Sequence, residues 1–456
     1  MFHTFPEDSP YKILSGKLLT RDELPFDKEE VDLLIEQSLL HKNPSILSTK
    51  GKNICQRCGN EKPYLFARFP HATCHKQDCL YCRNCIMMGR VTICEPLYAG
   101  SPMLAWEKHS DPCTWEGELT AGQQLAASRI SSAIQNKEEL LVWAVCGAGK
   151  TEMLFPGLTI GLRLGLRICI ATPRTDVVRE LLPRLKQAFP RVLIEGLYGD
   201  SEEKDGQAQL LVSTTHQLYR FAHAFDVMII DEIDAFPYHN DPSLQSAAKR
   251  AAKLEAAHIY LTATPRKKVK RQIKKKQLPA VFIPARFHGH PLPIPHLKLS
   301  PTLRYQLAKD QLPSSITRKI AIQQKGRRQL LLFVSTISYA QIIEQLLKDD
   351  YSVASVHAED PERAEKVQAF RDQKIQIIVT TTILERGVTF PSVDVFVIDA
   401  GHHVYDEAAL VQIAGRAGRS PADPTGEVVF YHIGKTNAML DAQEAISKMN
   451  RLAKKS

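Results

Sequence analysis

The most informative segment of the chain reads Ala144-Val145-Cys146-Gly147-Ala148-Gly149-Lys150-Thr151. It overlaps the end of an apolar run from Leu140 to Val145, which indicates a buried strand that leads into a glycine loop and then a helix. Glycines let backbone amides approach phosphates, a lysine reaches the outer phosphates, and a threonine hydroxyl can ligate Mg²⁺. The segment predicts a nucleotide-binding loop, although Ala144 replaces the usual first glycine. The expected contacts are Gly147, Ala148, Gly149, Lys150 and Thr151.

A second apolar run, from Val227 to Ile230, ends in two carboxylates. Doubly wound sheets bind their ligands at the carboxyl ends of parallel strands. We therefore expect Asp231 to hold Mg²⁺ together with Thr151, and Glu232 to accept a proton from the water that attacks the terminal phosphate. Taken alone, this motif is equally compatible with an acidic loop after a strand. Because the Lys150 loop occurs in the same chain, the catalytic interpretation is favoured.

Seven of the ten cysteines lie between Cys55 and Cys94, ahead of the loop. Two CxxC pairs, Cys55 with Cys58 and Cys82 with Cys85, are separated by 23 residues. This spacing is close to that of Cys₄ zinc ribbons, and a redox CxxC would need only one pair beside a βαβ unit. The two pairs therefore predict a structural zinc site.

The zinc ligand set stays open on sequence alone. Cys79 also stands in CxxC spacing with Cys82, and His71 and Cys74 are nearby. Any of these three could replace an assigned ligand. They could equally be packing thiols and a surface histidine.

Length and composition indicate a multidomain protein, because 456 residues with 44% hydrophobic content suffice for more than one core. The best candidate membrane span, Leu154 to Ile170, is interrupted by a proline and two arginines. The amino terminus carries Glu7 and Asp8 and lacks a secretory pattern. We expect no transmembrane segment and a cytoplasmic protein.

The formal net charge is +9, and the segment from Arg266 to Lys276 holds eight cations and no acid. In an arbitrary protein such a run is most often a solvated helix face. Here it follows the nucleotide motifs and could lie along a phosphate backbone. Lys267, Lys268 and Lys270 are the expected nucleic-acid contacts in this run.

Two series of strand-like runs alternate with helical patterns, which predicts two parallel α/β domains. The proline-rich stretch 282–295 separates the two series and marks a hinge. The first series covers 140–145, 167–172, 210–214, 227–231 and 258–262, and the second covers 330–334, 353–356, 375–380, 393–398 and 428–432. The expected units are an N-terminal segment (1–50), a zinc-binding module (51–100) and two domains (101–288 and 289–456).

Only the first domain has a phosphate loop, so a nucleotide held between the domains would need an arginine from the second. The segment Gln412-Ile413-Ala414-Gly415-Arg416-Ala417-Gly418-Arg419 offers two guanidinium groups. They could neutralise charge that develops on the transferred phosphoryl group. Gln412, Arg416 and Arg419 complete the expected catalytic set with Lys150, Asp231 and Glu232, and Arg419 is the candidate arginine finger.

The order of these motifs resembles that of superfamily 2 helicases, whose motifs I, II, III and VI are similar to 144–151, 231–234, 261–265 and 412–419. The resemblance implies two tandem RecA-like domains, an ATP-dependent helicase or translocase, and adenine reading by Gln123. It also implies strand contacts at positions similar to motifs Ia, Ib and V, namely Thr172, Arg174, Thr214, Thr381 and Arg386. Many relatives have aspartate where this chain has Thr389, which removes one expected link between strand contact and hydrolysis.

The CxxC pairs ahead of the motor, and the segment 82–91 in particular, resemble the late competence helicase-like family ComFA of transformable Gram-positive bacteria. Membership implies ATP, Mg²⁺ and Zn²⁺ as cofactors, single-stranded DNA as the activating ligand, and a role in DNA uptake. The implied partners are the competence proteins ComFC and DprA and the membrane DNA channel. The resemblance also implies a peripheral location on the inner face of the cytoplasmic membrane.

Two other functions fit the same motifs. A primosome-type helicase of replication and repair also carries zinc, but that family inserts its cysteines within the second motor domain. A non-processive, ATP-gated DNA-binding scaffold would use the same cleft as a switch. The zinc module itself could bind DNA, dock a partner or only stabilise its fold.

Overall fold

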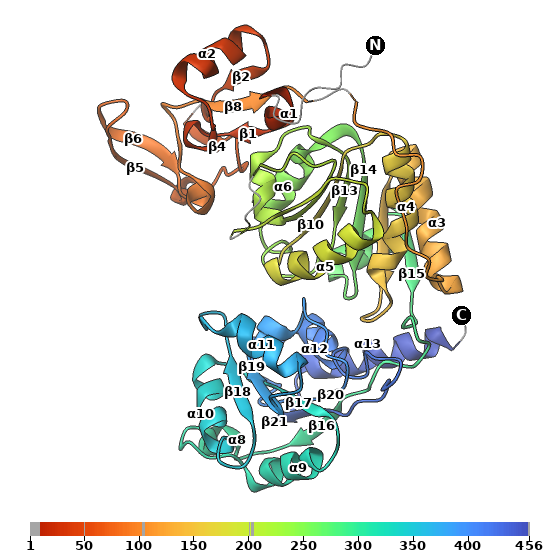
Figure 1. The fold of residues 1–456 in the computed structure, drawn as a ribbon. Helices are drawn as coiled ribbons and strands as arrows, with labels where there is room; N and C mark the ends of the chain where they lie inside the picture. Colours follow the sequence, from red (N-terminus) through yellow and green to blue (C-terminus); the bar gives the residue numbers. More distant parts are fainter. Residues whose placement is uncertain (1–9, 50, 103–104, 200, 202–204, 455–456) are drawn as a thin grey trace.

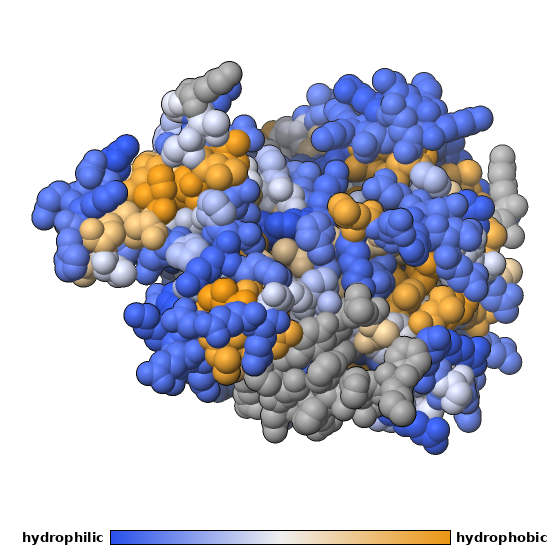
Figure 2. Space-filling model, turned by 90° about the horizontal axis from the view of Figure 1, so that it is seen from above, coloured by the Kyte–Doolittle hydropathy of each residue, from blue (hydrophilic) through white to orange (hydrophobic). Residues whose placement is uncertain are grey.

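The structure is a computed structural model that describes residues 10–49, 51–102, 105–199, 201 and 205–454. An N-terminal unit, a first α/β domain (domain 1) and a second α/β domain (domain 2) follow one another along the chain (Figure 1). In the described part of the chain, no helix combines the length and apolar character needed to cross a membrane. Figure 2 shows a mostly hydrophilic face, on which the hydrophobic areas are separate.

The N-terminal unit contains an antiparallel sheet that joins its first and last strands. Helix α2 (Lys28–Glu36), capped by Asp27, buries Val31 and Leu34 against this sheet. The strand order is β1 (Leu18–Leu19), β8 (Leu97–Gly100), β2 (Leu40–Asn43). Because β2 pairs with β8, the expected boundary between residues 50 and 51 does not divide two separately folded units.

The cysteine-rich segment is inserted between β2 and β8. The hairpin of β5 and β6 projects from the body of the molecule at the left of Figure 1. The elements of the insertion are β3 (Ile46–Thr49), β4 (Lys52–Cys55), η2 (Pro63–Leu65), β5 (Phe66–His71), β6 (Lys76–Cys82), η3 (Arg83–Met88) and β7 (Val91–Thr92).

Domain 1 is built on a parallel sheet that includes every strand expected from the first series. Its order is β11 (Ile194–Leu197), β12 (Leu210–Thr214), β10 (Ile168–Thr172), β13 (Phe225–Ile230), β14 (Ala252–Thr262), β9 (Glu139–Ala144), β15 (Ala280–Ile283). Strands β11 and β15 were not expected. Strand β15 pairs with β9, so the proline-rich stretch begins inside the domain 1 sheet.

The strands of domain 1 are mostly apolar because both faces of the sheet are covered. Ile168 and Ile170 point to the face covered by α3 (Ala121–Asn136), α4 (Lys150–Arg163) and α5 (Thr175–Ala188). Cys169 and Ala171 point to the opposite face. That face is covered by α6 (Pro242–Ala251), η4 (Thr215–Arg220) and the N-terminal unit.

Domain 2 repeats this architecture, which confirms the prediction of two tandem parallel α/β domains. Its sheet order is β16 (His296–Leu299), β21 (Val428–His432), β20 (Val393–Val397), β17 (Gln329–Phe333), β19 (Ile377–Thr380), β18 (Val353–Val356). One face carries α8 (Leu303–Leu307), α9 (Ser314–Gln324) and α10 (Ile337–Leu347). The face toward domain 1 carries α11 (Arg363–Arg371), α12 (Glu407–Ala414) and α13 (Asn437–Ala453) (Figure 1).

Buried arginines fasten the N-terminal unit to domain 1. Arg167 is 0% exposed and donates to the carbonyl oxygens of Ser15 (3.0 Å), Gly206 (2.7 Å) and Ala208 (3.3 Å). Burial lowers the pKa of its guanidinium to about 10, so it stays charged at neutral pH. The charge is balanced by carbonyl dipoles and by the ring of Trp106, 4.6 Å from the guanidinium.

A second arginine contact holds the cysteine-rich segment itself. Arg57, between two cysteines of the first CxxC pair, is buried and pairs with Glu23 at 2.7 Å. Arg250 of α6 donates to the carbonyl oxygens of Arg57 and Tyr219. The first CxxC turn is therefore tied to domain 1 through its backbone.

We predict that Arg167→Ala destabilises the full chain by about 3 kcal/mol or more, because buried carbonyl groups lose a charged donor and a cavity is left. The midpoint of the first urea-unfolding transition measures this. Arg163→Ala is the matched control, since its side chain is 53% exposed and its ion pair with Asp111 is 3.6 Å long. Equal effects of the two substitutions would contradict the proposed role of Arg167.

Candidate functional site

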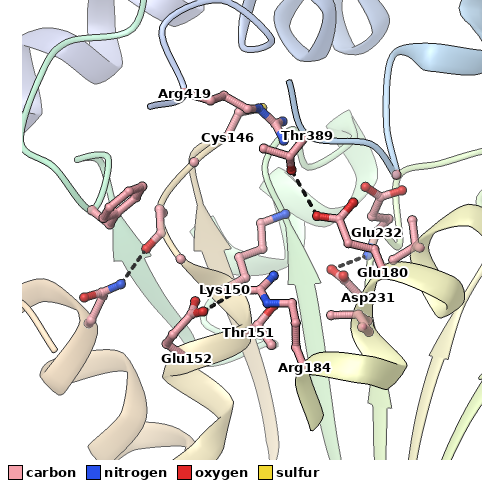
Figure 3. A pocket seen from close by; sticks show the side chains of 18 of the residues that line it. Cys146, Lys150, Thr151, Glu152, Glu180, Arg184, Asp231, Glu232, Thr389 and Arg419 are labelled. Atoms are coloured by element: carbon pink, nitrogen blue, oxygen red, sulfur yellow. Dashed lines mark hydrogen bonds and ion pairs between the residues drawn. The ribbon is translucent and has the colours of Figure 1, made fainter. Parts of the chain in front are cut away.

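A cavity of about 610 Å³ lies where the two α/β domains face each other. Figure 3 shows Lys150 pointing into it from domain 1, with Arg419 and Thr389 facing it from domain 2. Every residue expected to bind nucleotide or catalyse hydrolysis lines this cavity: Gln123, Gly147, Ala148, Gly149, Lys150, Thr151, Asp231, Glu232, Gln412, Arg416 and Arg419.

The loop between β9 and α4 has the backbone shape that a phosphate site needs. Gly147 and Gly149 have φ values of +78° and +72°, a region that favours glycine. A Cβ at Gly149 would lie 2.4 Å from Nε2 of Gln123. Helix α4 begins at Lys150, so its amino-terminal N–H groups and the Lys150 ammonium are available to an anion.

Gln123 holds this loop in place through its side-chain hydrogen bonds. Its Oε1 accepts from the backbone N–H of Thr120 at 2.8 Å, and its Nε2 donates to the carbonyl of Ala148 at 3.0 Å. Both polar atoms of the carboxamide are thus engaged within the protein, and they fix the loop against the start of α3. The expected adenine contact of Gln123 stays a prediction.

The carboxylates stand at the carboxyl end of β13. Burial raises the pKa of Asp231 to about 6, and nearby Lys150 opposes this shift. Asp231 also accepts from the backbone N–H of Glu232 at 2.8 Å. Asp231 is half-buried and lines the same cavity as Thr151, and a carboxylate and a hydroxyl are oxygen ligands that suit a bound cation. Thr151 and Asp231 are the residues that would hold Mg²⁺.

Asp234 connects motif II to motif III and to domain 2. It is 1% exposed and accepts from the hydroxyls of Thr262 and Thr264, each at 2.5 Å. It also pairs with the guanidinium of Arg386 from domain 2 at 2.5 Å. Despite its burial, Arg386 and the two hydroxyls hold the pKa of Asp234 well below its usual range. The ion pair therefore joins the two domains three residues after Asp231 in the chain.

The two arginines of motif VI have different environments. Arg416 is 2% exposed and donates to the carbonyls of Glu385 (2.8 Å) and Val388, and burial lowers its pKa. Arg419 donates from its side-chain Nε to the carbonyl of Gly415 at 3.1 Å. Its guanidinium faces the cavity (Figure 3). Arg416 thus stabilises the backbone of motif V through its hydrogen bonds. Arg419 is the arginine better placed to reach a phosphate in the cavity.

Motif VI packs closely against the phosphate loop. Cys146 donates from Sγ to Oε1 of Gln412 at 3.0 Å. The buried Nε2 of Gln412 has no hydrogen-bond partner among the described residues. A Cβ at Gly415 would lie 2.6 Å from the Cβ of Cys146, so only glycine permits this approach.

Some of the expected strand contacts are buried in this conformation, and for these residues a role in strand binding stays a prediction. Thr172 is 0% exposed, and Thr214, its register partner on β12, is 7% exposed. Arg386 is 2% exposed and is bound by Asp234, with Glu385 and Glu232 also nearby. In this conformation a strand cannot reach these three side chains, because the packed ends of the sheets and the interdomain ion pair enclose them.

The remaining strand candidates are four cations and one threonine, and two of the cations already have a partner in the structure. Arg174 bonds to Glu385 (2.9 Å) and to the carbonyl of Ile383 across the domain interface. Lys270 pairs with Glu407 at 3.2 Å. Lys267 and Lys268 on α7 (Lys267–Lys274) are exposed, and Thr381 is half-buried at the carboxyl end of β19. Lys267, Lys268 and Thr381 remain available to a strand as the molecule stands.

Sequence reasoning missed Arg286, which lies in the proline-rich stretch. It is 2% exposed and donates to the carbonyls of Ala417 (2.9 Å) and Gly418. The next residue, Phe287, donates its backbone N–H to the carbonyl of Gly147 at 3.0 Å. The expected hinge is therefore anchored to both motif VI and the phosphate loop. The only feature of the sequence that pointed to this role of Arg286 was that it is the one arginine in the proline-rich stretch.

Two further contacts join the domains. Thr389 donates to Glu180 at 3.0 Å, so the residue that replaces the usual aspartate still contacts domain 1 (Figure 3). Arg363 pairs with Asp176. Both contacts depend on residues distant in sequence, which explains why no local motif predicted them.

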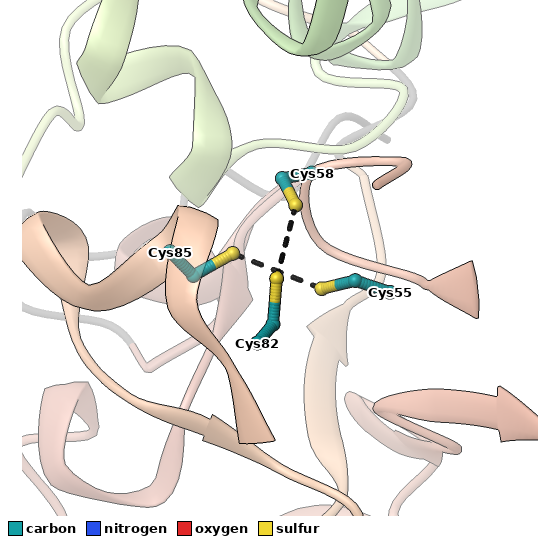
Figure 4. Close-up of side chains that lie close together, drawn as sticks. All are labelled: Cys55, Cys58, Cys82 and Cys85. Carbon is teal, nitrogen blue, oxygen red and sulfur yellow. Dashed lines mark hydrogen bonds between the residues drawn. The ribbon is translucent and has the colours of Figure 1, made fainter. Parts of the chain in front are cut away.

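The four predicted zinc ligands come together in one buried group. Figure 4 shows Cys55, Cys58, Cys82 and Cys85 pointing toward a common centre. The Sγ–Sγ distances are 3.7 Å for Cys55–Cys85 and 3.6 Å for Cys58–Cys82. Tetrahedral zinc with Zn–S bonds of about 2.3 Å requires sulfur separations of about 3.8 Å, so the group fits Zn²⁺.

The same group belongs to the core of the molecule. These cysteines pack in one apolar cluster with Met228 and Ile230 of domain 1. Asn84, within the second CxxC turn, donates to Ser243 of α6 at 2.9 Å. A metal here would therefore support both the N-terminal unit and its attachment to domain 1.

Comparisons with known proteins match family models along most of the chain. Residues 7–99 match the competence protein ComFA N-terminal domain, residues 116–267 the type III restriction enzyme res subunit, and residues 312–421 the helicase conserved C-terminal domain. Solved structures share the fold, which confirms the expectation of two tandem RecA-like parallel-sheet domains. Dbp5 of S. cerevisiae bound to RNA and ADP BeF3 has a TM-score of 0.54 and 17% identity, over 73% of this chain and 91% of that chain. Helicase Lhr of Mycobacterium smegmatis bound to ssDNA and AMP-PNP has a TM-score of 0.53 and 17% identity, over 75% of this chain and 51% of that chain.

Two curated relatives match from end to end. Competence protein ComFA of Bacillus subtilis is 46% identical over 97% of this chain and 95% of its own length. Competence protein ComFA of Streptococcus pneumoniae is 38% identical over 96% of this chain and 98% of its own length. With the helicase domains, these matches support a competence-associated, helicase-like ATPase. The chain therefore belongs to the competence protein ComFA family.

Proposed function

We propose that the chain is a single-stranded-DNA-dependent ATPase motor that helps drive transforming DNA across the cytoplasmic membrane during competence. The observation that supports this best is the composition of the interdomain cavity. Lys150, Asp231 and Glu232 enter it from domain 1, and Arg419 enters it from domain 2. A site divided between two domains can link ATP turnover to their relative movement.

In the proposed reaction the loop amides and Lys150 bind the phosphates of ATP. Mg²⁺, held by Thr151 and Asp231, would neutralise charge on the outer phosphates. Glu232 orients the attacking water and accepts its proton. Arg419 stabilises the charge that develops on the transferred phosphoryl group.

Strand binding would act on this site through the interdomain contacts. Asp234 is three residues from Asp231, and its partner Arg386 belongs to the same segment as Thr381, which is a proposed strand contact. A strand that orders this segment would favour the Asp234–Arg386 pair and the closed cavity. This route does not need the aspartate that Thr389 replaces.

The strand itself would be gripped without sequence preference. Lys267, Lys268 and the backbone near Thr381 would contact phosphates, and Arg174 could exchange Glu385 for a phosphate as the domains open. Such contacts release counterions, so binding should weaken steeply as salt increases.

Family membership supports the biological part of the proposal. The relatives carry the name competence protein, and we propose that ComFC, DprA and the membrane DNA channel are partners of this chain as well. The motor would then work on the cytoplasmic side of the membrane, where a strand emerges from the channel.

ATP turnover measured without nucleic acid, with single-stranded DNA, with duplex DNA and with RNA tests the proposal. We expect large stimulation by single-stranded DNA alone, which falls between about 50 and 200 mM salt as strand binding weakens. Lys150→Ala should abolish turnover but still bind the strand at low nucleotide, because the phosphate loop and the strand contacts are separate. Equal stimulation by all nucleic acids, or by none, would contradict the proposal.

A motor can be distinguished from an ATP-gated scaffold by displacement of streptavidin from a biotinylated single strand. A translocating motor removes streptavidin at a rate that depends on ATP. Strand-stimulated hydrolysis without displacement would favour the scaffold.

We predict that Arg419→Ala lowers the strand-stimulated kcat by about 10³ or more, the effect expected when an arginine finger is lost. The KM for ATP should change far less, since the guanidinium acts mainly on the transition state. Steady-state kinetics of the full chain measure both quantities.

Two variants serve as controls. Arg318→Ala, on the exposed side of α9, should leave kcat unchanged. Arg416→Ala should lower the unfolding midpoint as well as turnover, because Arg416 donates to buried carbonyls of motif V. Wild-type turnover by Arg419→Ala would exclude it as the finger.

A further inference from the structure

A second group of metal-ligand side chains lies in the N-terminal unit, apart from the buried Cys₄ group. It consists of His71, Cys74, Cys79 and Cys94, whose donor atoms all lie within 4.8 Å of one another. None of these residues belongs to the Cys₄ group, so neither His71, Cys74 nor Cys79 replaces one of its ligands. Cys79 stands in CxxC spacing with Cys82, yet the two cysteines belong to different groups.

Strand pairing brings these four residues together from four places in the chain. His71 ends β5, Cys74 lies in the following turn, and Cys79 lies on β6 opposite Phe69. Cys94 follows β7, the third strand of this sheet. The turn that carries Cys74 is closed by His75 with φ of +54°. The four side chains are therefore brought together by the fold and not by one local sequence motif.

The distances are those of a tetrahedral site. His71 Nδ1 lies 3.1 Å from Cys94 Sγ and 3.6 Å from Cys74 Sγ, and Cys79 Sγ lies 3.5 Å from Cys94 Sγ. With Zn–S of about 2.3 Å and Zn–N of about 2.0 Å, tetrahedral zinc separates two sulfurs by about 3.8 Å and sulfur from nitrogen by about 3.5 Å. The observed separations reach these values with shifts of a few tenths of an ångström.

Apolar packing does not explain why these four side chains lie together, because the hairpin that carries three of them has little core. The β5–β6 hairpin projects from the body of the molecule (Figure 1), and most residues of these strands are exposed or half-buried. Its aromatic residues Phe69 and Tyr81 are covered by Arg90 instead of by an apolar layer. A small sheet with so little core is the kind of structure that a bound metal stabilises.

We propose that this group is a second zinc site, in which Zn²⁺ is bound by Nδ1 of His71 and by the thiolates of Cys74, Cys79 and Cys94. It closes the projecting hairpin onto the segment after β7. Its Cys₃His ligand set differs from the buried Cys₄ set, and Cys79 alone among its members is fully enclosed. The zinc in this site should therefore exchange with solvent chelators faster than the zinc in the Cys₄ site.

Metal content of the purified full chain, measured by inductively coupled plasma mass spectrometry, tests the proposal. We expect two zinc ions per chain in the wild type and one in the double variant Cys74→Ser, Cys94→Ser. Cys113→Ser is the matched control, because Cys113 is half-buried and outside both groups, and it should retain two. Zinc X-ray absorption should show mixed sulfur and nitrogen ligands in the wild type and sulfur alone in the double variant.

One zinc per chain with sulfur-only coordination in the wild type would overturn the proposal. So would a Cys79–Cys94 disulfide, found by mass spectrometry in protein purified under reducing conditions. Circular dichroism and the unfolding midpoint of domain 1 check that the double variant remains folded. If both zinc ions are lost together in that variant, the two sites are not separate and the assignment fails.

Discussion

The ion pair between Asp234 and Arg386 is the most deeply buried of the ion pairs that join the two domains in the described part of the chain. Both side chains are almost completely buried, and they come from different domains. A buried charge left without its partner costs about 3–5 kcal/mol. Neither side chain can therefore stay buried away from water without the other. When the domains separate, water must enter and both groups must be solvated together. An interface of this kind is expected to favour a closed and an open state over intermediate ones. The hydroxyls of Thr262 and Thr264 donate to Asp234, which stands three residues after Asp231 in the chain.

The N-terminal unit completes domain 1 and is not an independent appendage. Its cysteine group packs on the sheet face opposite the one that carries the phosphate-loop helix α4. Arg167 and Arg250 fix the unit through main-chain carbonyls, which define position and orientation more strictly than apolar contact does. Whatever the unit binds is thereby held in a constant relation to the sheet that carries Lys150 and Asp231. The projecting β5–β6 hairpin is the part left free to meet other molecules.

Where the motifs are local, sequence reasoning identified residues that share one cavity. The Lys150 loop and the Asp231 strand end are contiguous segments, and all eleven nucleotide and catalytic residues expected from the sequence line one cavity. Sequence reasoning was insufficient where the position of a side chain depends on its tertiary partners. Thr172 and Arg386 were assigned to the strand, but burial and an ion pair occupy them, and Arg286 was overlooked because its partners are backbone carbonyls more than a hundred residues away. Cys79 could be assigned to its metal group only after β5 and β6 were paired.

Fluorescence energy transfer between the two domains tests the central claim, that the Asp234–Arg386 pair holds the closed state. Dyes attached through unnatural amino acids at the exposed positions of Leu164 in domain 1 and Ile322 in domain 2 would report closure. With a non-hydrolysable ATP analogue and single-stranded DNA, the wild type should populate the high-transfer state. Arg386→Gln should lose it, because removal of one partner costs about 3 kcal/mol, or roughly a hundredfold in population. Undiminished closure in Arg386→Gln would contradict the account.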